Sequence, residues 1–210
     1  MWYTIRNAIG KRVNIIWTRL TRQGVWVTAL WAADHLVRIL TGAPIRRLSQ
    51  ITPHLHVGGQ YRRRGWPRLV KRGITAVMNL RTEFDDREAG IAPTRYLYLP
   101  TPDDTPPSLE QLRRGVAFIA QEAEQGGGVY VHCGAGVGRA ATMAAAYLVS
   151  TGLTPDQAWA RLRAVRPFIR PQPVQSAQIQ RFAETWESSQ AITRDHIHPQ
   201  EQKAPRGFEG

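Results

Sequence analysis

The segment Val129-Tyr-Val-His-Cys-Gly-Ala-Gly-Val-Gly-Arg-Ala-Ala-Thr142 is the most informative part of this chain of 210 residues. The β-prone run 129–132 leads directly into a glycine-rich loop, and an apolar helix is expected over 140–149. Such a loop points successive backbone N–H groups at one place, and the following helix adds the positive end of its dipole. The segment therefore predicts an α/β unit that carries a site for an anion such as phosphate.

Two side chains of this loop carry the expected chemistry. The field of the loop amides and the helix dipole favours the thiolate of Cys133, which is a nucleophile near neutral pH. Arg139 returns on the first helical turn, where its planar guanidinium can hold two phosphate oxygens and stabilise transferring charge. The glycines let the backbone close around a ligand. We expect the phosphate-binding loop to comprise Gly134, Ala135, Gly136, Val137, Gly138 and Arg139.

Metal sites find little support in the sequence. Cys133 is the single cysteine, so the chain can form neither an intramolecular disulfide nor a cysteine-based zinc site. Two His-x-His pairs, His54 with His56 and His196 with His198, have no further ligands nearby. We therefore expect neither a metal nor a cofactor.

His132, Cys133 and Arg139 resemble the His-Cys-x5-Arg active-site loop of the cysteine-based protein tyrosine phosphatase superfamily, particularly its dual-specificity branch. The resemblance extends over roughly 52–187. It implies a mixed central sheet flanked by helices, and metal-independent hydrolysis of phosphomonoesters through a cysteinyl-phosphate intermediate. It also implies that His132 orients the loop and tunes the thiol.

The resemblance further implies a general acid on a separate loop about thirty residues before the cysteine. The segment Leu99-Pro-Thr-Pro-Asp-Asp-Thr-Pro-Pro107 lies there. Asp103 is the first choice and Asp104 the second, because spacing on such loops varies by a residue. The alternative for either is a solvated aspartate in a proline-flanked turn.

Ala140 departs from the family pattern, in which Ser or Thr mostly follows the arginine and assists departure of the thiolate. A phosphate-binding pseudophosphatase with little turnover is therefore one alternative. The loop 133–140 also resembles that of some glucan phosphatases, and it lacks the lysines of certain phosphoinositide phosphatases. We expect a dual-specificity protein phosphatase acting on Tyr and Ser/Thr, with a phospholipid or phosphoglucan phosphatase of the same fold as the alternative.

The N-terminal third is strongly basic. The net charge is +12, and residues 1–72 hold 14 Lys and Arg but one acidic residue, Asp34. A helical stripe is expected after Gly24, formed by Trp26, Leu30, Ala33, Val37 and Leu40. Two alternatives follow: this amphipathic helix docks on the main domain, or residues 1–45 lie on an anionic membrane surface. The run Arg62–Arg64 indicates a solvated turn or the rim of a site for an acidic substrate, and we do not expect nucleic acid as a partner.

The chain divides into a basic, Trp-rich helical extension (1–50), a catalytic domain (51–188) and a disordered tail (189–210). Apolar stretches near the N-terminus are too short to cross a membrane or to form a secretory signal. We expect a cytoplasmic protein, either free or peripheral on the membrane. Strands are expected at 54–57, 74–80, 95–99 and 129–132, and helices at 68–72, 109–125, 140–149, 155–166 and 174–187.

Overall fold

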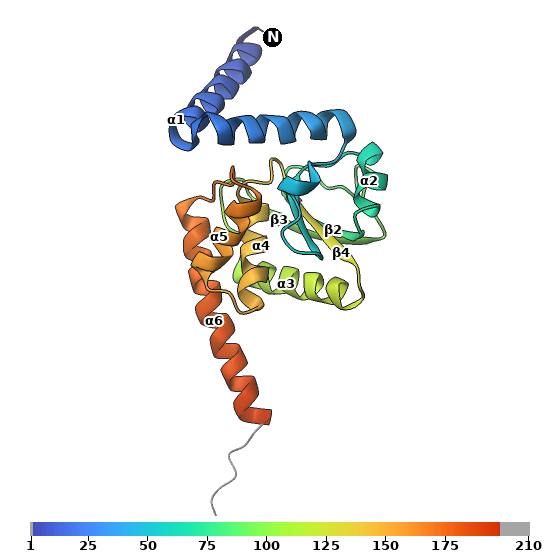
Figure 1. Cartoon of the computed structure of the whole chain (residues 1–210), viewed down its shortest axis with the longest axis vertical. Helices are drawn as coiled ribbons and strands as arrows, with labels where there is room; N and C mark the ends of the chain where they lie inside the picture. The colour runs from blue at the N-terminus through green and yellow to red at the C-terminus, as the bar shows by residue number, and fades with distance from the viewer. Residues whose placement is uncertain (1, 198–210) are drawn as a thin grey trace, which may run out of the picture.

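The computed structural model describes the backbone of residues 2–197 and the side chains of residue 18 and residues 20–188 (Figure 1). The predicted strands and helices of the catalytic domain are present, with small shifts at most of their ends. In chain order the elements are α1 (Trp2–Thr41), η1 (Arg46–Leu48), β1 (Leu55–Gly59), η2 (Arg63–Gly65), α2 (Trp66–Val70), β2 (Ile74–Arg81), β3 (Arg95–Thr101), α3 (Leu109–Glu124), β4 (Gly128–Cys133), α4 (Arg139–Ser150), α5 (Pro155–Val165) and α6 (Pro173–Ile197).

The four strands form one sheet in the order β1-β4-β2-β3, and every neighbouring pair is parallel. The α/β class is confirmed. Within the described residues, the antiparallel part of the expected mixed sheet is reduced to an isolated bridge between Gln50 and His56. Because parallel strands end at the same edge of a sheet, Gly59, Arg81, Thr101 and Cys133 all lie at one edge.

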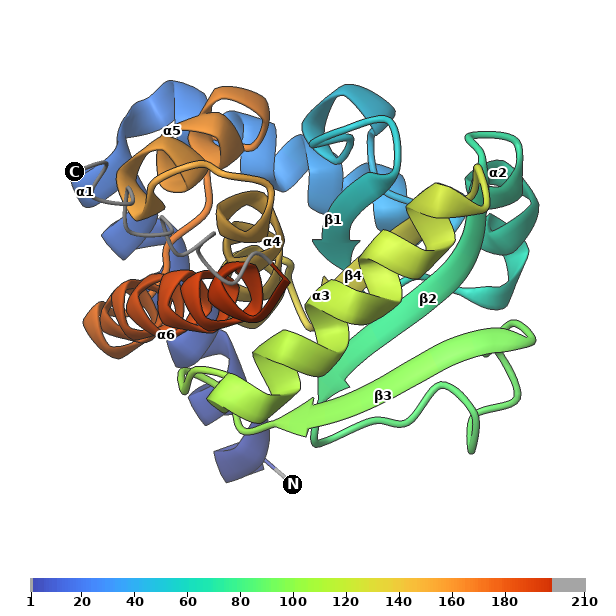
Figure 2. The same cartoon turned by 90° about the horizontal axis from the view of Figure 1, so that it is seen from below.

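Helices cover both faces of the sheet. The larger hydrophobic core lies between the sheet and helices α3 to α6, and Figure 2 shows α3 lying across β4 and β2. A smaller core beneath α2 contains Tyr61, Leu69 and Tyr130. Strands β1 and β4 are buried along their whole length, as is usual for parallel strands covered on both faces.

Two helices begin as the sequence predicts. In α3 the Ser108 side chain accepts a hydrogen bond from the Gln111 amide, and the Gln111 side chain accepts one from the Ser108 amide. Thr154 and Gln157 form the same capping box at the start of α5. Each box satisfies two amide groups that the first helical turn leaves unpaired, which fixes where the helix starts.

Helix α1 bends sharply at Gly24, whose φ is 83°, and its second half runs across the domain (Figure 1). The predicted apolar stripe is not the face that packs against the domain: Trp26 is 74% exposed and Leu40 is 65% exposed. Asp34 and Arg38 are buried instead. The docked face is polar, since Asp34 pairs with the buried Arg166. The second half of the helix therefore docks on the domain, while its apolar side stays exposed.

Helix α6 continues to Ile197, past the point where the sequence predicts a disordered tail. The segment 189–197 contains neither Gly nor Pro, the two residues that disfavour helix most, so nothing in it ends the helix. The rest of the predicted tail, 198–210, lies outside the described residues. Among the helices that the structure describes, none combines the length and the apolar character needed to cross a membrane.

His56 makes the stability of this domain dependent on pH. It is fully buried on β1, and neither ring nitrogen has a hydrogen-bond partner among the described residues. Burial, and then the charges of Arg72 and Arg46, lower the pKa of His56 from 6.5 to about 4. Between these pH values the unfolded chain binds a proton here that the folded chain does not, so stability falls as the pH drops through this window.

We expect His56 to lower the free energy of unfolding by about 1.4 kcal/mol for each unit by which the pH drops across that window. Denaturant unfolding in a series of buffers from about pH 7 to pH 4 measures the slope. The variant His56→Leu should show a smaller slope than the wild type. Equal slopes in the two proteins would contradict the assignment.

Candidate active site

The phosphate-binding loop joins β4 to α4, and its carbonyl oxygens accept hydrogen bonds from residues outside the loop. The acceptors and donors are Gly134 O with Gln60 N at 3.1 Å, Ala135 O with Arg166 Nη2 at 3.2 Å, Gly136 O with Arg166 Nε at 2.8 Å, and Val137 O with Arg170 N at 2.8 Å. Because these carbonyls are satisfied on the outer side, the amides of the loop can converge on an anion.

Cys133 lies at the start of this loop, at the end of the central strand, and is 4% exposed. Its Sγ accepts a hydrogen bond from the Gly136 amide at 3.3 Å, so the sulfur lies against the amides of the loop. Gly136 has a φ of 70°, and a Cβ at this position would collide with the carbonyl group of Gly58. The loop therefore requires glycine at that point, as the sequence predicts.

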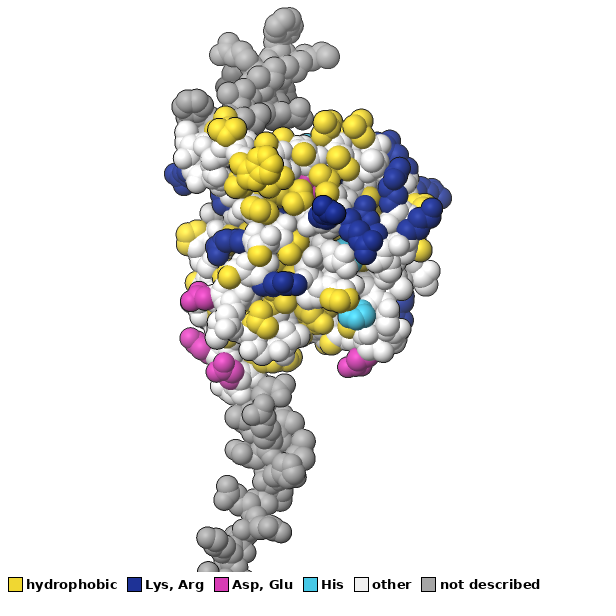
Figure 3. Space-filling view, in the orientation of Figure 1, with side chains coloured by type: hydrophobic (Ala, Val, Ile, Leu, Met, Phe, Trp, Pro, Cys, Tyr) yellow, Lys and Arg dark blue, Asp and Glu magenta, His cyan; other side chains and the backbone are white. Residues whose placement is uncertain are grey.

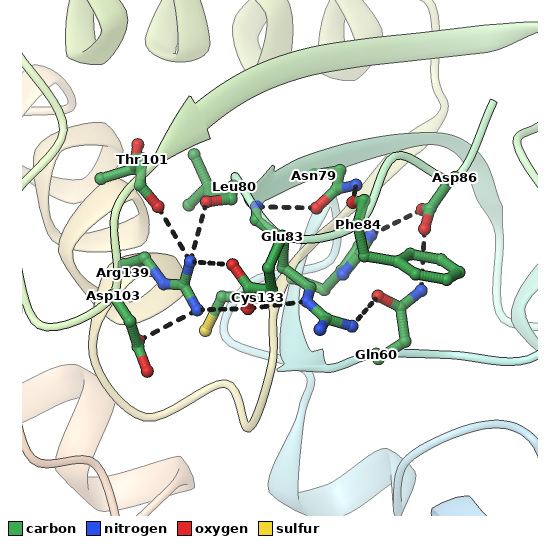
Figure 4. Close-up of polar contacts among 12 residues, drawn as sticks. Gln60, Asn79, Leu80, Glu83, Phe84, Asp86, Thr101, Asp103, Cys133 and Arg139 are labelled. Atoms are coloured by element: carbon green, nitrogen blue, oxygen red, sulfur yellow. Dashed lines mark hydrogen bonds and ion pairs between the residues drawn. The ribbon is translucent and has the colours of Figure 1, made fainter. Parts of the chain in front are cut away.

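Arg139 opens α4 and is clamped beside the cysteine (Figure 4). Its Nη1 and Nη2 donate to the two carboxylate oxygens of Glu83, each at 3.0 Å, and Nη1 also donates to Thr101 O at 2.8 Å. The hydrogen bond from Arg139 lowers the pKa of Glu83 to about 2, so this carboxylate stays ionised. The buried Arg139 Nε has no partner among the described residues, which leaves it for a ligand oxygen.

The charge of Arg139 is secured by its surroundings. Burial, the largest influence, lowers its pKa, but the hydrogen bond with Glu83 and the nearby Cys133 and Asp103 raise the pKa above its ordinary value overall. The guanidinium is therefore a fixed positive charge next to Cys133. A fixed charge of this kind stabilises negative charge on a bound phosphoryl group without reorganising.

The two candidate acids are placed differently. Asp103 is 78% exposed in its side chain, and its Oδ1 lies 2.9 Å from Arg139 Nη2. Asp104 adopts a positive φ of 58°, and its Oδ1 accepts a hydrogen bond from Gln172 Nε2 at 3.1 Å. The structure thus brings Asp103, the first choice, to the loop and turns Asp104 toward the start of α6.

His132 is held by residues that the sequence analysis did not single out. Its Nε2 lies 2.7 Å from Asp86 Oδ2, and both side chains are fully buried. Asp86 Oδ1 in turn accepts a hydrogen bond from Gln60 Nε2 at 2.8 Å (Figure 4). Asp86 thus fixes the ring of His132. The role of His132 in orienting the loop stays a prediction.

Three further residues of the site were missed: Glu83, Asp86 and Arg166. The first two come just after β2, at the carboxyl end of a strand, and this position was the available signal. Arg166 follows α5 and holds two carbonyls of the loop, a role that its place in the sequence does not indicate. The thiol, the anion cradle and the nearby carboxyl group can together support nucleophilic attack on a phosphoryl group with protonation of the leaving oxygen.

The comparisons with known proteins agree with this geometry. Residues 59–153 match the family model "Polymorphic toxin system, DSP-PTPase phosphatase". The chain is 30% identical over 155 residues to the phosphatidylglycerophosphate phosphatase PTPMT2 of Arabidopsis thaliana, covering 71% of this chain and 68% of that protein. It is 34% identical over 121 residues to dual specificity protein phosphatase 12 of Rattus norvegicus, covering 56% of this chain and 36% of that protein.

Solved structures of phosphatases also resemble this chain. The crystal structure of PTPMT1 superposes with a TM-score of 0.62 at 26% identity, covering 69% of this chain and 98% of that chain. The structure of PTPMT1 in complex with PI(5)P also has a TM-score of 0.62, at 27% identity, and covers 67% of this chain and 96% of that chain. The chain therefore belongs to the cysteine-based protein tyrosine phosphatase superfamily, in its dual-specificity branch, and is a cysteine-based phosphatase.

Proposed function

We propose that this phosphatase works without a metal, through a cysteinyl-phosphate on Cys133, and that it removes the terminal phosphate of phospholipids at an anionic membrane surface. The observation that carries the chemistry is the loop itself, whose carbonyls are held outward around a buried thiol beside Arg139. This geometry supports binding of a tetrahedral oxyanion directly in front of a nucleophile.

In the first step the Cys133 thiolate attacks phosphorus in line, and the bond from phosphorus to the ester oxygen breaks as the bond to sulfur forms. Asp103 gives its proton to the departing oxygen, while Arg139 and the loop amides hold the three other oxygens. In the second step water attacks phosphorus and passes a proton to the Asp103 carboxylate. The bond to sulfur breaks, which releases inorganic phosphate and restores the thiolate.

Helix α1 supports the lipid as substrate. Its exposed apolar side chains fall on one side of the helix, opposite Asp34 and Arg38; they are Val25, Trp26, Leu36, Ile39 and Leu40. Figure 3 shows hydrophobic side chains gathered over α1, beside a group of Lys and Arg side chains. An exposed apolar stripe next to cationic groups is typical of a helix that lies in the interface of an anionic membrane.

The relatives support the same class of substrate. One of them is a phosphatidylglycerophosphate phosphatase, and one solved structure holds PI(5)P. A protein phosphatase acting on Tyr and Ser/Thr, the leading expectation from the sequence, is the second candidate, and the similarity to dual specificity protein phosphatase 12 favours it. The exposed apolar side chains of α1 support the lipid, because a soluble phosphoprotein would leave them without a partner.

Ala140 leaves the pseudophosphatase alternative to be tested. It is fully buried at the start of α4, and Thr142 donates its hydroxyl proton to Gly138 O at 3.1 Å. Neither residue therefore supplies a free hydroxyl next to the thiol. The second step of turnover has to proceed without the hydroxyl that family members commonly use.

Phosphate release in excess chelator tests the proposal. The panel contains phosphotyrosine and phosphothreonine peptides, phosphorylated glucan, and phosphatidylglycerophosphate and phosphoinositides in vesicles with or without added phosphatidylglycerol. We expect kcat/KM to be at least about tenfold higher for a lipid than for the peptides, and higher on the anionic vesicles. A preference for the peptides would overturn the lipid assignment in favour of the second candidate. No release at all would favour a phosphate-binding protein, and Ala140→Ser would be the variant to make next.

A further inference from the structure

A groove of about 800 Å³ lies beside the active site at the carboxyl edge of the sheet. It is formed by the end of α1, the segment that follows β1 and the loop that follows β2. Its most notable lining residues are four arginines and two apolar side chains: Arg38, Arg62, Arg63, Arg64, Ile39 and Phe84. The catalytic chemistry described above uses none of them.

Among the described residues, no carboxylate pairs with the positive charge of the groove. Arg62 and Arg63 are exposed, and neither forms an ion pair with a residue that the structure describes. The Arg64 guanidinium donates to Ile39 O, a neutral acceptor. Arginines gathered in this way attract an anion, and their planar donors suit phosphate oxygens.

Arg38 gives the strongest indication that an anion belongs here. Its side chain is 7% exposed and donates to Gln60 O and to His35 Nδ1, each at 2.8 Å. Its Nε has no partner, and no carboxylate among the described residues forms an ion pair with it. A buried cation without a counter-charge is costly, so a bound anion would stabilise this arrangement.

The groove adjoins the phosphate-binding loop. A Cβ built on Gly59 would lie 2.7 Å from both Arg38 Cζ and Gly134 O, so the guanidinium and the loop pack against the same glycine. Gln60 lines the groove, and its Oε1 accepts a hydrogen bond from Arg81 at 2.9 Å. Figure 4 shows Gln60 on the opposite side of Glu83 from Arg139. The groove therefore lies next to the loop, and the contacts from Gln60 to Arg81 and from Arg81 to Glu83 connect it to Arg139.

We propose that this groove binds a second phosphate group of the substrate, the phosphodiester of a phospholipid whose terminal phosphomonoester lies at Cys133. Arg38, Arg62 and Arg63 contact the phosphodiester oxygens, and Ile39 and Phe84 contact the apolar part next to it. The proposal rests on the lipid substrate proposed above and adds the feature by which that substrate is recognised. It gives the arginine run 62–64 a role as the rim of a site for an acidic substrate.

The test compares two double variants that remove the same charge. Arg62→Gln/Arg63→Gln changes the groove, whereas Arg113→Gln/Arg114→Gln changes two exposed arginines of α3. The substrates are phosphatidylglycerophosphate in micelles of a neutral detergent and p-nitrophenyl phosphate, which has no second phosphate. We expect the groove variant to lower the ratio of kcat/KM on the lipid to kcat/KM on p-nitrophenyl phosphate about tenfold, mainly through KM. The α3 variant should keep the wild-type ratio.

Two further arms identify the source of the phosphate that is recognised. With the deacylated, water-soluble substrate glycerophosphoglycerophosphate we expect the same loss of selectivity, because the phosphodiester is retained. A loss confined to the micelles would assign the arginines to the lipid surface and overturn the subsite. Inorganic phosphate should inhibit the wild type and the groove variant equally, and weaker inhibition of the variant would show general attraction of anions instead.

Failure of this proposal differs from failure of the proposed function. Hydrolysis of the lipid with an unchanged ratio in the groove variant would overturn the subsite alone. Hydrolysis of p-nitrophenyl phosphate by the wild type without hydrolysis of either substrate that contains a phosphodiester would overturn the lipid substrate itself.

Discussion

Replacing Cys133 with Ser lowers kcat by at least about 10⁴-fold, the largest effect that we expect from any single substitution in this chain. A serine hydroxyl is a far weaker nucleophile than a thiolate at neutral pH. The loop around it is unchanged, because its carbonyls are held by Gln60, Arg166 and Arg170 and not by the cysteine. Binding of phosphatidylglycerophosphate should therefore stay within a few-fold of the wild type.

Rapid-quench mass spectrometry is the direct measurement. The wild type should accumulate a phosphoryl adduct on the peptide that contains Cys133, whereas Cys133→Ser should yield neither the adduct nor free phosphate. Thermal unfolding of both proteins controls for loss of the fold. Unchanged hydrolysis by a folded Cys133→Ser variant would remove Cys133 as the nucleophile.

The phosphate-binding loop could be predicted because it is local in sequence. Strand, glycines, cysteine and arginine are contiguous from Val129 to Thr142, and φ, loop length and helix start follow from residue types. The supports of the loop could not be predicted in the same way. Arg166 and Arg170 reach it from beyond α5, and the contact depends on how α4 and α5 pack.

The docked face of helix α1 is a second feature that the sequence pattern could not predict. Its apolar spacing predicts a helix, and the helix is present, but periodicity indicates only that an apolar face exists. The face that docks was decided by the ion pair between Asp34 and Arg166, whose Nη2 and Oδ2 atoms lie 3.2 Å apart although the residues are distant in sequence. If another face of the helix docked, Arg166 would be buried without a carboxylate, which is costly, so the pair requires Asp34 to point inward.

The acidic residues after β2 were also beyond sequence reasoning. Several acidic side chains occur between 83 and 88, and their spacing does not distinguish one from another. The path of the loop brings Glu83 to Arg139 and Asp86 to His132. Composition at the carboxyl edge of the sheet predicts that such residues matter, while tertiary packing selects which of them contact the site.

Asp103→Asn is expected to lower kcat by about 10²-fold or more on alkyl phosphomonoesters, which include the phospholipids. Their alkoxide leaving groups need a proton. The exposed carboxyl group of Asp103 lies beside the loop, 2.9 Å from Arg139, whereas the other carboxyl group at Arg139, that of Glu83, stays ionised. On p-nitrophenyl phosphate the effect should be much smaller, because the nitrophenolate leaves without protonation. Steady-state kinetics on both substrates measures the difference.

Asp104→Asn is the matched control, since it makes the same chemical change one residue further along the loop. Asn tolerates the positive φ of this position, so the variant keeps the backbone of the loop. Its amide can also keep the contact with Gln172, and we expect kcat near that of the wild type on both substrates. If Asp104→Asn alone showed the dependence on the leaving group, the acid would be Asp104, and the loop would have to turn when substrate binds. If neither variant showed it, the proton would come from outside this loop.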